Sequence, residues 1–69
     1  MPKTVLLSVG ERPAVFNKFK VWRNDLSDEA ILQKMSRLPS TIRQCSNQEE
    51  AERCKADFES CIGTSVSVE

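Results

Sequence analysis

The feature that most constrains the fold of this chain is an apolar stripe in its last third, with the spacing of one helix face. The stripe occupies positions i, i+3, i+7, i+10 and i+11: Ala51, Cys54, Phe58, Cys61 and Ile62. Ser46 and Asn47 each precede a glutamate at the spacing of a helix-capping box. Gly63 can adopt the left-handed conformation that ends a helix. The pattern predicts a helix over 47–62 whose other side is charged and solvent-exposed: Glu49, Glu52, Arg53 and Asp57.

The same stripe suggests what the cysteines are for. The chain has three cysteines and no histidine, whereas a structural zinc site usually needs four Cys or His ligands. Cys54 and Cys61 would lie about 10.5 Å apart along a helix, which is too far for a disulfide between them. Free cysteine packs as a small apolar side chain. We therefore expect packing roles, with no metal and no cofactor. Cys45 lies outside the stripe and can be partly exposed.

The first third of the chain predicts a β-hairpin. Residues 3–9 are rich in aliphatic and β-branched side chains, and the turn residues of GERP (10–13) follow them. Residues 14–22 are interpreted as the second strand, in which alternate side chains point to opposite faces. The odd set is expected to face the core: Val15, Asn17, Phe19 and Val21. The even set would form an outer face that is both aromatic and basic: Phe16, Lys18, Lys20 and Trp22.

Three further segments complete the predicted fold. A helix over 27–38 begins at Ser27, a good N-cap residue, and ends before Pro39. Residues 40–45 fit either a short strand, which we favour, or a kinked continuation of that helix. Residues 64–68, TSVSV, predict a last strand.

Together these segments predict one small domain of the α+β class over residues 1–69. The expected sheet is antiparallel, and its strands are the hairpin 3–9/14–22, the C-terminal strand 64–68 and, as the open alternative, 40–45. The helices expected to pack on it are 27–38 and 47–62. A chain of 69 residues buries a small core, so we expect a thin stability margin.

The composition argues against an enzyme. Without histidine, no Ser-His or Cys-His pair can form within the chain. The two glycines, Gly10 and Gly63, are not clustered as a phosphate-binding loop requires. The longest strongly apolar run, residues 5–7, is too short for a membrane span or a signal-peptide core. We therefore expect a cytoplasmic protein without catalytic activity or membrane association.

A binding function remains, and its candidate surface is the outer face of the second predicted strand. The predicted partner-binding residues are Phe16, Lys18, Lys20, Trp22 and Arg23. Aromatic and arginine side chains are enriched among interface hot spots. The first hypothesis is thus a small regulator or inhibitor that covers the surface of a larger host protein. Short accessory proteins of bacteriophages and mobile elements often act in this way.

Other interpretations of this strand stay open. The aromatic residues can belong to the core while the lysines protect a sheet edge. If both strand faces are partly apolar, a second copy can cover one of them and form a homodimer. The alternative function is binding of single-stranded DNA or RNA, with bases stacked on the aromatics and phosphates neutralised by the lysines. The formal net charge of zero weakens that alternative, because polyanion binders usually carry a clear positive excess.

Overall fold

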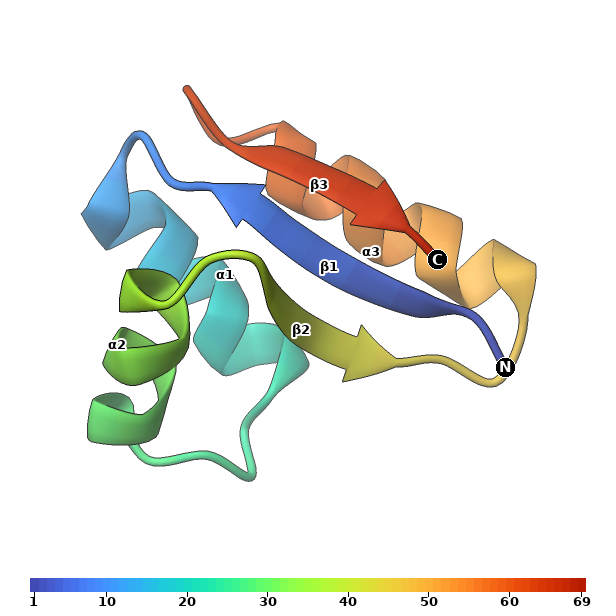
Figure 1. Cartoon of the computed structure of the whole chain (residues 1–69), viewed down its shortest axis with the longest axis horizontal. Coiled ribbons are helices and arrows are strands. Elements are labelled where there is room, and N and C mark those ends of the chain that lie inside the picture. Colours follow the sequence, from blue (N-terminus) through green and yellow to red (C-terminus); the bar gives the residue numbers. More distant parts are fainter.

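Three antiparallel strands and three helices make up the computed structural model, which describes residues 1–69 (Figure 1). In chain order the elements are β1 (Lys3–Ser8), α1 (Arg12–Trp22), α2 (Asp28–Ser36), β2 (Ser40–Gln44), α3 (Gln48–Glu59) and β3 (Ser65–Val68). The α+β class is therefore confirmed. None of the helices has both the length and the apolar character that crossing a membrane would require.

The sheet has the order β2-β1-β3, so the first strand of the chain lies in its middle. Leu6 of β1 stands opposite Ser40 of β2 on one side and Val66 of β3 on the other. α1 and α3 pack behind the sheet as viewed in Figure 1, and α2 packs against α1 beside the start of β2. The face of the sheet toward the viewer carries no helix (Figure 1).

The core lies between the sheet and the helices. At its centre the rings of Phe19 and Phe58 meet edge to face, with centroids 5.8 Å apart. Cys54 and Cys61 pack in this core, as the stripe predicts. Cys45, whose exposure the sequence leaves open, is also buried, with 1% of its surface exposed. Cys45 N–H donates to Pro2 O (2.8 Å) and continues the pairing of β2 with the start of the chain.

The strand predicted over 14–22, and with it the hairpin 3–9/14–22, is wrong, because this segment forms α1. Val15 and Phe19 are fully buried one helical turn apart. Asn17 and Val21, which a strand would also turn to the core, are exposed, Val21 by 72%. Pro13 lies in the first turn of α1, where a missing N–H costs a helix nothing. The true partners of β1 are β2 and β3.

The predicted helix over 27–38 is confirmed as α2, and the alternative of a strand over 40–45 is confirmed as β2. Ser27 caps α2, since its Oγ accepts a hydrogen bond from Ala30 N (3.2 Å). The predicted last strand over 64–68 corresponds to β3.

The predicted helix over 47–62 corresponds to α3. Asn47 caps it, because its Oδ1 accepts a hydrogen bond from Glu50 N (2.8 Å), while Glu50 Oε2 accepts one from Ser46 N (3.1 Å). α3 ends at Glu59, earlier than predicted. Ile62 therefore leaves the apolar face and is 76% exposed. The prediction that Ile62 belongs to the apolar stripe is therefore wrong.

Two turns at one end of the molecule touch through their glycines. Gly63 has φ of 76° and directs the chain from α3 into β3, as predicted for a helix stop. A Cβ built on Gly10 would lie 2.7 Å from Gly63 Cα. Glu11 N–H donates to Ile62 O (3.1 Å) and joins the turn before α1 to the turn before β3. Only glycine allows the two backbones to come this close.

Candidate partner-binding surface

The helical geometry of α1 divides the five predicted partner-binding residues between different sides of the molecule. Residues four apart share a helix face, whereas a strand would have aligned every second one. Phe16 and Lys20 face α2, with Lys20 Nζ 5.5 Å from the centroid of the Phe16 ring and 3.3 Å from Asp28 Oδ1. Lys18 and Trp22 instead face α3. Arg23 comes directly after Trp22, the last residue of α1. The continuous aromatic-basic face predicted for a strand does not form.

Asp57 of α3 holds both residues that face it. Lys18 Nζ donates to Asp57 Oδ1 (2.8 Å), and Trp22 Nε1 donates to Asp57 Oδ2 (2.6 Å). The hydrogen bond from Lys18 lowers the pKa of the Asp57 carboxyl group, and the same bond raises the pKa of Lys18. The expectation that Asp57 is solvent-exposed like Glu52 is wrong, because its carboxylate fastens α1 to α3. Glu49 and Arg53 are exposed as predicted and form an ion pair (3.3 Å).

Replacing Asp57 by asparagine is expected to lower the free energy of unfolding at neutral pH, by an amount that shrinks in acid. The pKa of Asp57 is depressed in the folded state, so its contribution is present above its ordinary value of 3.8 and is lost as pH falls through the lower folded value. Urea unfolding of both proteins between about pH 7 and about pH 2.5 measures this. Glu52→Gln, on the exposed side of α3, should change stability by less than about 0.5 kcal/mol throughout. An Asp57→Asn difference that stays constant with pH would contradict the ionic role.

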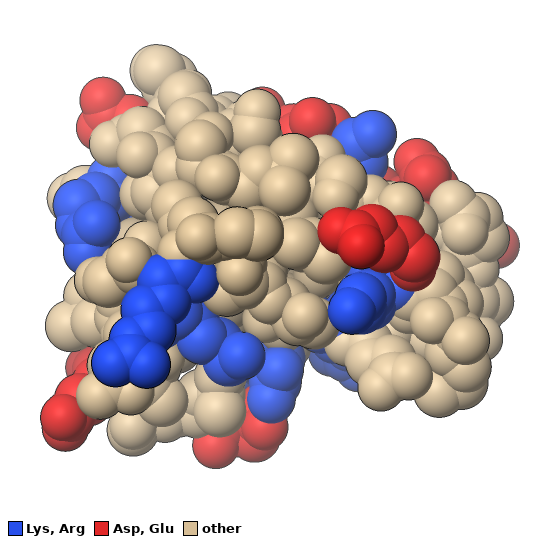
Figure 2. Space-filling view, in the orientation of Figure 1, with Lys and Arg blue, Asp and Glu red and all other residues tan.

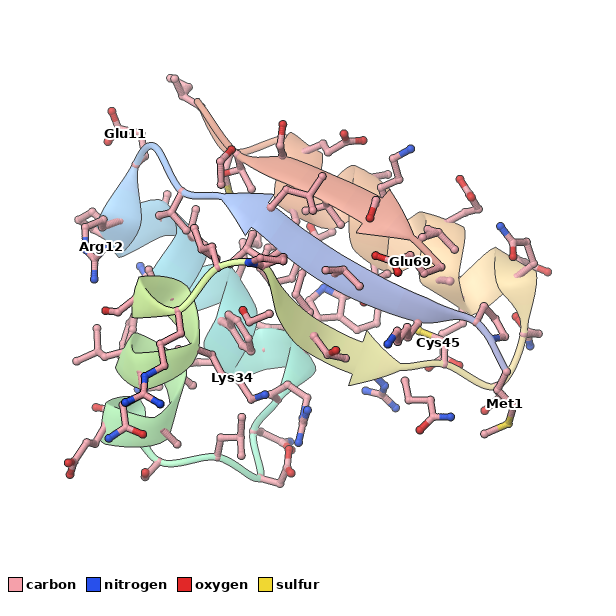
Figure 3. All side chains as sticks on the ribbon, viewed as in Figure 1. Met1, Glu11, Arg12, Lys34, Cys45 and Glu69 are labelled. Carbon is pink, nitrogen blue, oxygen red and sulfur yellow. The ribbon has the colours of Figure 1, made fainter.

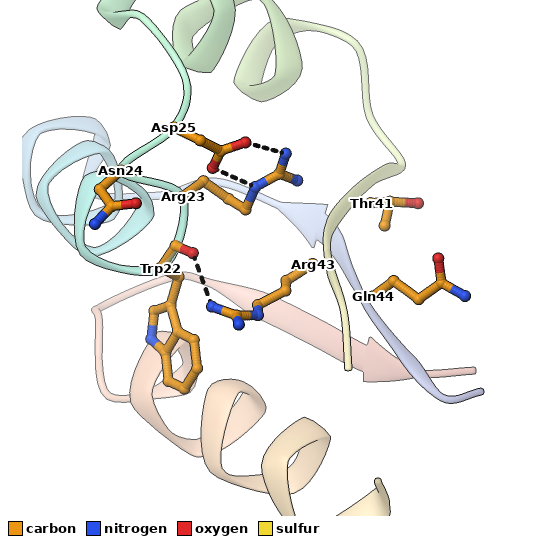
Figure 4. Close-up of a pocket in the computed structure, with 7 residues that line it drawn as sticks. All are labelled: Trp22, Arg23, Asn24, Asp25, Thr41, Arg43 and Gln44. Atoms are coloured by element: carbon orange, nitrogen blue, oxygen red, sulfur yellow. Dashed lines mark hydrogen bonds and ion pairs between the residues drawn. The ribbon is translucent and has the colours of Figure 1, made fainter. Parts of the chain in front are cut away.

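A surface hollow lies where the end of α1 meets β2 (Figure 4). It has a volume of about 620 Å³. Its lining residues are Trp22, Arg23, Asn24, Asp25, Thr41, Arg43 and Gln44. Arg43 lies with its guanidinium carbon 5.9 Å from the centroid of the Trp22 ring, and its Nη1 donates to Trp22 O (3.3 Å). We call this region the Trp22–Arg43 hollow.

The second arginine of the hollow is held more tightly. Arg23 donates from Nε and Nη2 to the two carboxylate oxygens of Asp25, each at 3.0 Å, as Figure 4 shows. Its Nη1 donates to Ile42 O (3.0 Å) on the outer edge of β2. The hydrogen bond from Arg23 lowers the pKa of Asp25. Arg23 is therefore fixed in place, with only a quarter of its side chain exposed.

A register irregularity in the sheet brings Arg43 to this position. The pairing of β1 with β2 shifts between Thr4 and Val5. Such a bulge lets two consecutive residues point to the same side of a sheet. Ile42 is buried in the core, and Arg43 beside it contacts Trp22 and lies 3.4 Å from Glu50. Sequence reasoning missed Arg43, because no local pattern within 40–45 places it beside the end of α1.

Ion pairs balance the positive charge of the surface around α1 and β2. Four basic residues around α1 and β2 each have a carboxylate within 4 Å: Lys18, Lys20, Arg23 and Arg43. Figure 2 shows Lys and Arg gathered over the region of α2 and β2, with Asp and Glu at its margins. Lys34 extends this basic region by reaching from α2 to β2, where its Nζ donates to Thr41 O (3.4 Å) (Figure 3).

None of the cysteines lines the hollow, although Cys45 Sγ lies 3.8 Å from Arg43 O. All three cysteines are free and buried. Burial raises the pKa of Cys54 to about 11, so this side chain is a neutral thiol at physiological pH and a poor nucleophile. Comparison with protein-family models, curated proteins and solved structures finds no match to this chain.

Proposed function

We propose that this protein is a non-enzymatic regulator that inhibits a larger host protein by covering part of its surface. The observation that carries the proposal is that an indole ring and two guanidinium groups meet at the open Trp22–Arg43 hollow. Tryptophan and arginine are the side chains most enriched among interface hot spots. Trp22 and Arg23 are held by Asp57 and Asp25 before any partner arrives. Such preorganisation reduces the entropy lost on binding.

The chemistry of the hollow favours an acidic segment of the partner. Arg43 is the more available arginine, because 43% of its side chain is exposed and its contacts to Trp22 O and Glu50 are 3.3 and 3.4 Å long. A carboxylate of the partner can accept two hydrogen bonds from such a guanidinium group. The partner's neighbouring apolar side chain would pack on the exposed part of Trp22.

Ion pairing on this surface supports a protein partner over a nucleic acid. Affinity for phosphates comes largely from uncompensated basic residues that release counterions. Here Lys18, Lys20, Arg23 and Arg43 are each compensated by a carboxylate of the same chain. The formal net charge of the chain is zero. Only Arg43, which has the longest of these ion pairs (3.4 Å to Glu50), stays available to an anion, and one such position suits a single carboxylate of a protein better than the successive phosphates of single-stranded DNA or RNA.

The setting that we propose follows from the size and the thiols. A small chain without histidine fits the accessory type of protein encoded by bacteriophages and mobile elements, which block a host protein rather than catalyse a reaction. Its three free cysteines are typical of a reducing compartment. The proposed site of action is the host cytoplasm.

Capture from a bacterial lysate tests the proposed surface with a matched pair of variants. Arg43→Gln removes the charge at the hollow, and Arg12→Gln removes the same charge at the far end of α1. We expect the wild type and Arg12→Gln to retain a partner that Arg43→Gln loses, while circular dichroism shows all three folded. Mass spectrometry then identifies the partner for a direct binding measurement.

Two outcomes would contradict this proposal. One is a partner that Arg43→Gln binds as well as the wild type does. The other is retention of the wild type on heparin or single-stranded DNA that is lost at moderate salt, with no protein captured. The second result would favour the nucleic-acid alternative, since salt dependence reports phosphate contacts.

A further inference from the structure

The two edge strands of the sheet, β2 and β3, differ in whether the backbone groups on their outer side have hydrogen-bond partners. On β2, Arg23 Nη1 donates to Ile42 O (3.0 Å) and Lys34 Nζ donates to Thr41 O (3.4 Å). None of the side-chain hydrogen bonds of the protein ends on the backbone of β3, and no strand lies beyond it. α3 packs behind β3 rather than beside its edge (Figure 1). An open strand edge of this kind is a template for another strand.

The register of β3 identifies the groups that face outward. Lys3 and Glu69 exchange two backbone hydrogen bonds, each 2.8 Å long. Bonded and non-bonded pairs alternate along an antiparallel ladder, so Val5 and Ser67 form the next bonded pair. Val68 stands opposite Thr4, between these two bonded pairs, and Val66 stands opposite Leu6, beyond them. Neither of these two pairs is hydrogen-bonded. The N–H and C=O groups of Val66 and Val68 therefore point away from β1, toward the open edge.

We propose that β3 pairs with β3 of a second copy of this chain, across a two-fold axis at Ser67. In this antiparallel arrangement Val66 of each copy stands opposite Val68 of the other, and each such pair exchanges two hydrogen bonds. All outward groups of both strands are then satisfied, and the two sheets become one. The interface is isologous, as in most homodimers. The homodimer considered from the sequence would have used one face of a strand over 14–22. That face does not exist, because the segment forms the helix α1.

Two features of the β3 edge favour this register and a second copy of the chain as the partner. Moving the axis to Val66 would place Thr64 of the second copy opposite Val68, but Thr64 N–H already donates to Cys61 O (3.3 Å). Residues 62–68 carry no charged side chain, so identical edges do not repel each other. The two Glu69 residues would be separated by about 14 Å along the strands. That distance exceeds the screening length of about 8 Å at physiological salt. The edge is thus complementary to itself.

Sedimentation of the full chain tests this dimer, with Ser67→Lys as the decisive variant. Ser67 and its neighbour Val5 both lie outside the core cluster between the sheet and the helices, so the change leaves that cluster intact. In the dimer it places two ammonium groups directly opposite each other, which is destabilising. We expect the wild type to dimerise with rising concentration to twice its mass of 7.8 kDa. Dimerisation of Ser67→Lys should be at least tenfold weaker.

Gln44→Lys is the matched control, because it adds the same charge to the other edge strand. It should dimerise like the wild type. Val68→Pro provides a second variant that removes an outward N–H without breaking a bond to β1, and edge strands tolerate proline. It should also be monomeric, with the circular dichroism spectrum of the wild type.

Three results would overturn the proposal. The first is a wild type that stays at 7.8 kDa at every concentration tested. The second is a dimer that Ser67→Lys forms as tightly as the wild type. The third is a monomeric wild type whose lysate partner is lost in Val68→Pro, since the edge would then accept a strand of another protein.

Discussion

Replacing Phe58 by alanine is expected to leave the protein largely unfolded at room temperature. Phe58 is fully buried, and its ring meets Phe19 at an interplanar angle of 90°. Truncating a core phenylalanine costs about 3–5 kcal/mol. Domains have only roughly 0.05–0.15 kcal/mol of stability per residue, so a chain this small has little more than that to lose. Thermal and urea unfolding followed by circular dichroism measure the loss.

The same experiment on Cys54→Ala is the matched comparison. Cys54 is also fully buried, and its Sγ lies 3.4 Å from Thr4 Oγ1. Alanine removes only one sulfur atom and leaves a small void, so the protein should stay folded with a lower melting temperature. A chelator should have no effect on either variant. A folded Phe58→Ala beside an unfolded Cys54→Ala, or a melting temperature that a chelator lowers, would show that the thiols do more than pack.

Adding a single methyl group at Gly10 is expected to separate the two turns that touch there. The Cβ of Gly10→Ala would lie 2.7 Å from both Gly63 Cα and Ile62 O. Both atoms belong to the backbone, so relief requires one turn to move and strains the bond from Glu11 N to Ile62 O. Over-packing of this kind costs about 1–3 kcal/mol. Urea unfolding should show at least that loss.

Gly63→Ala and the double variant test whether one contact is responsible. Gly63→Ala adds the cost of a non-glycine residue at φ of 76°, about 1–2 kcal/mol, to the same steric conflict. Because Gly10 and Gly63 touch, the double variant should lose less than the two single losses combined. Strict additivity, or a wild-type midpoint for Gly10→Ala, would mean that the turns do not depend on this close approach.

A helix or strand can be predicted from the sequence where the spacing of its apolar residues fits only one of the two structures, as it does in α3. The segment 14–22 is different, because Val15 and Phe19 are four residues apart and share a face in both a strand and a helix. The two structures differ at Asn17 and Val21, which a strand would bury. A polar Asn17 and the preceding Pro13 were local evidence for a helix. The core contacts of Val15 and Phe19 fit both structures, so only the exposed Asn17 and Val21 distinguish the helix from the strand.

The candidate site was predictable only in part, since its members come from distant segments. Trp22 and Arg23 were identified from their residue types, and both line the hollow. Arg43 is 21 residues from Trp22 in the sequence, and Asp57 is 35 residues from it. Their positions depend on the bulge in the sheet and on the packing of α1 against α3. No local pattern records such contacts.

The central position of β1 has a consequence for how the protein is made. β1 leaves the ribosome before both of its partners, β2 and β3, and Lys3 bonds to Glu69. α1 and α2 can form as they emerge, but the sheet cannot close until residue 68 has been released. Contacts between residues so far apart in sequence slow folding. During synthesis Val5 and Leu6 of β1 therefore remain exposed, and nascent chains on neighbouring ribosomes can pair through them before each has folded.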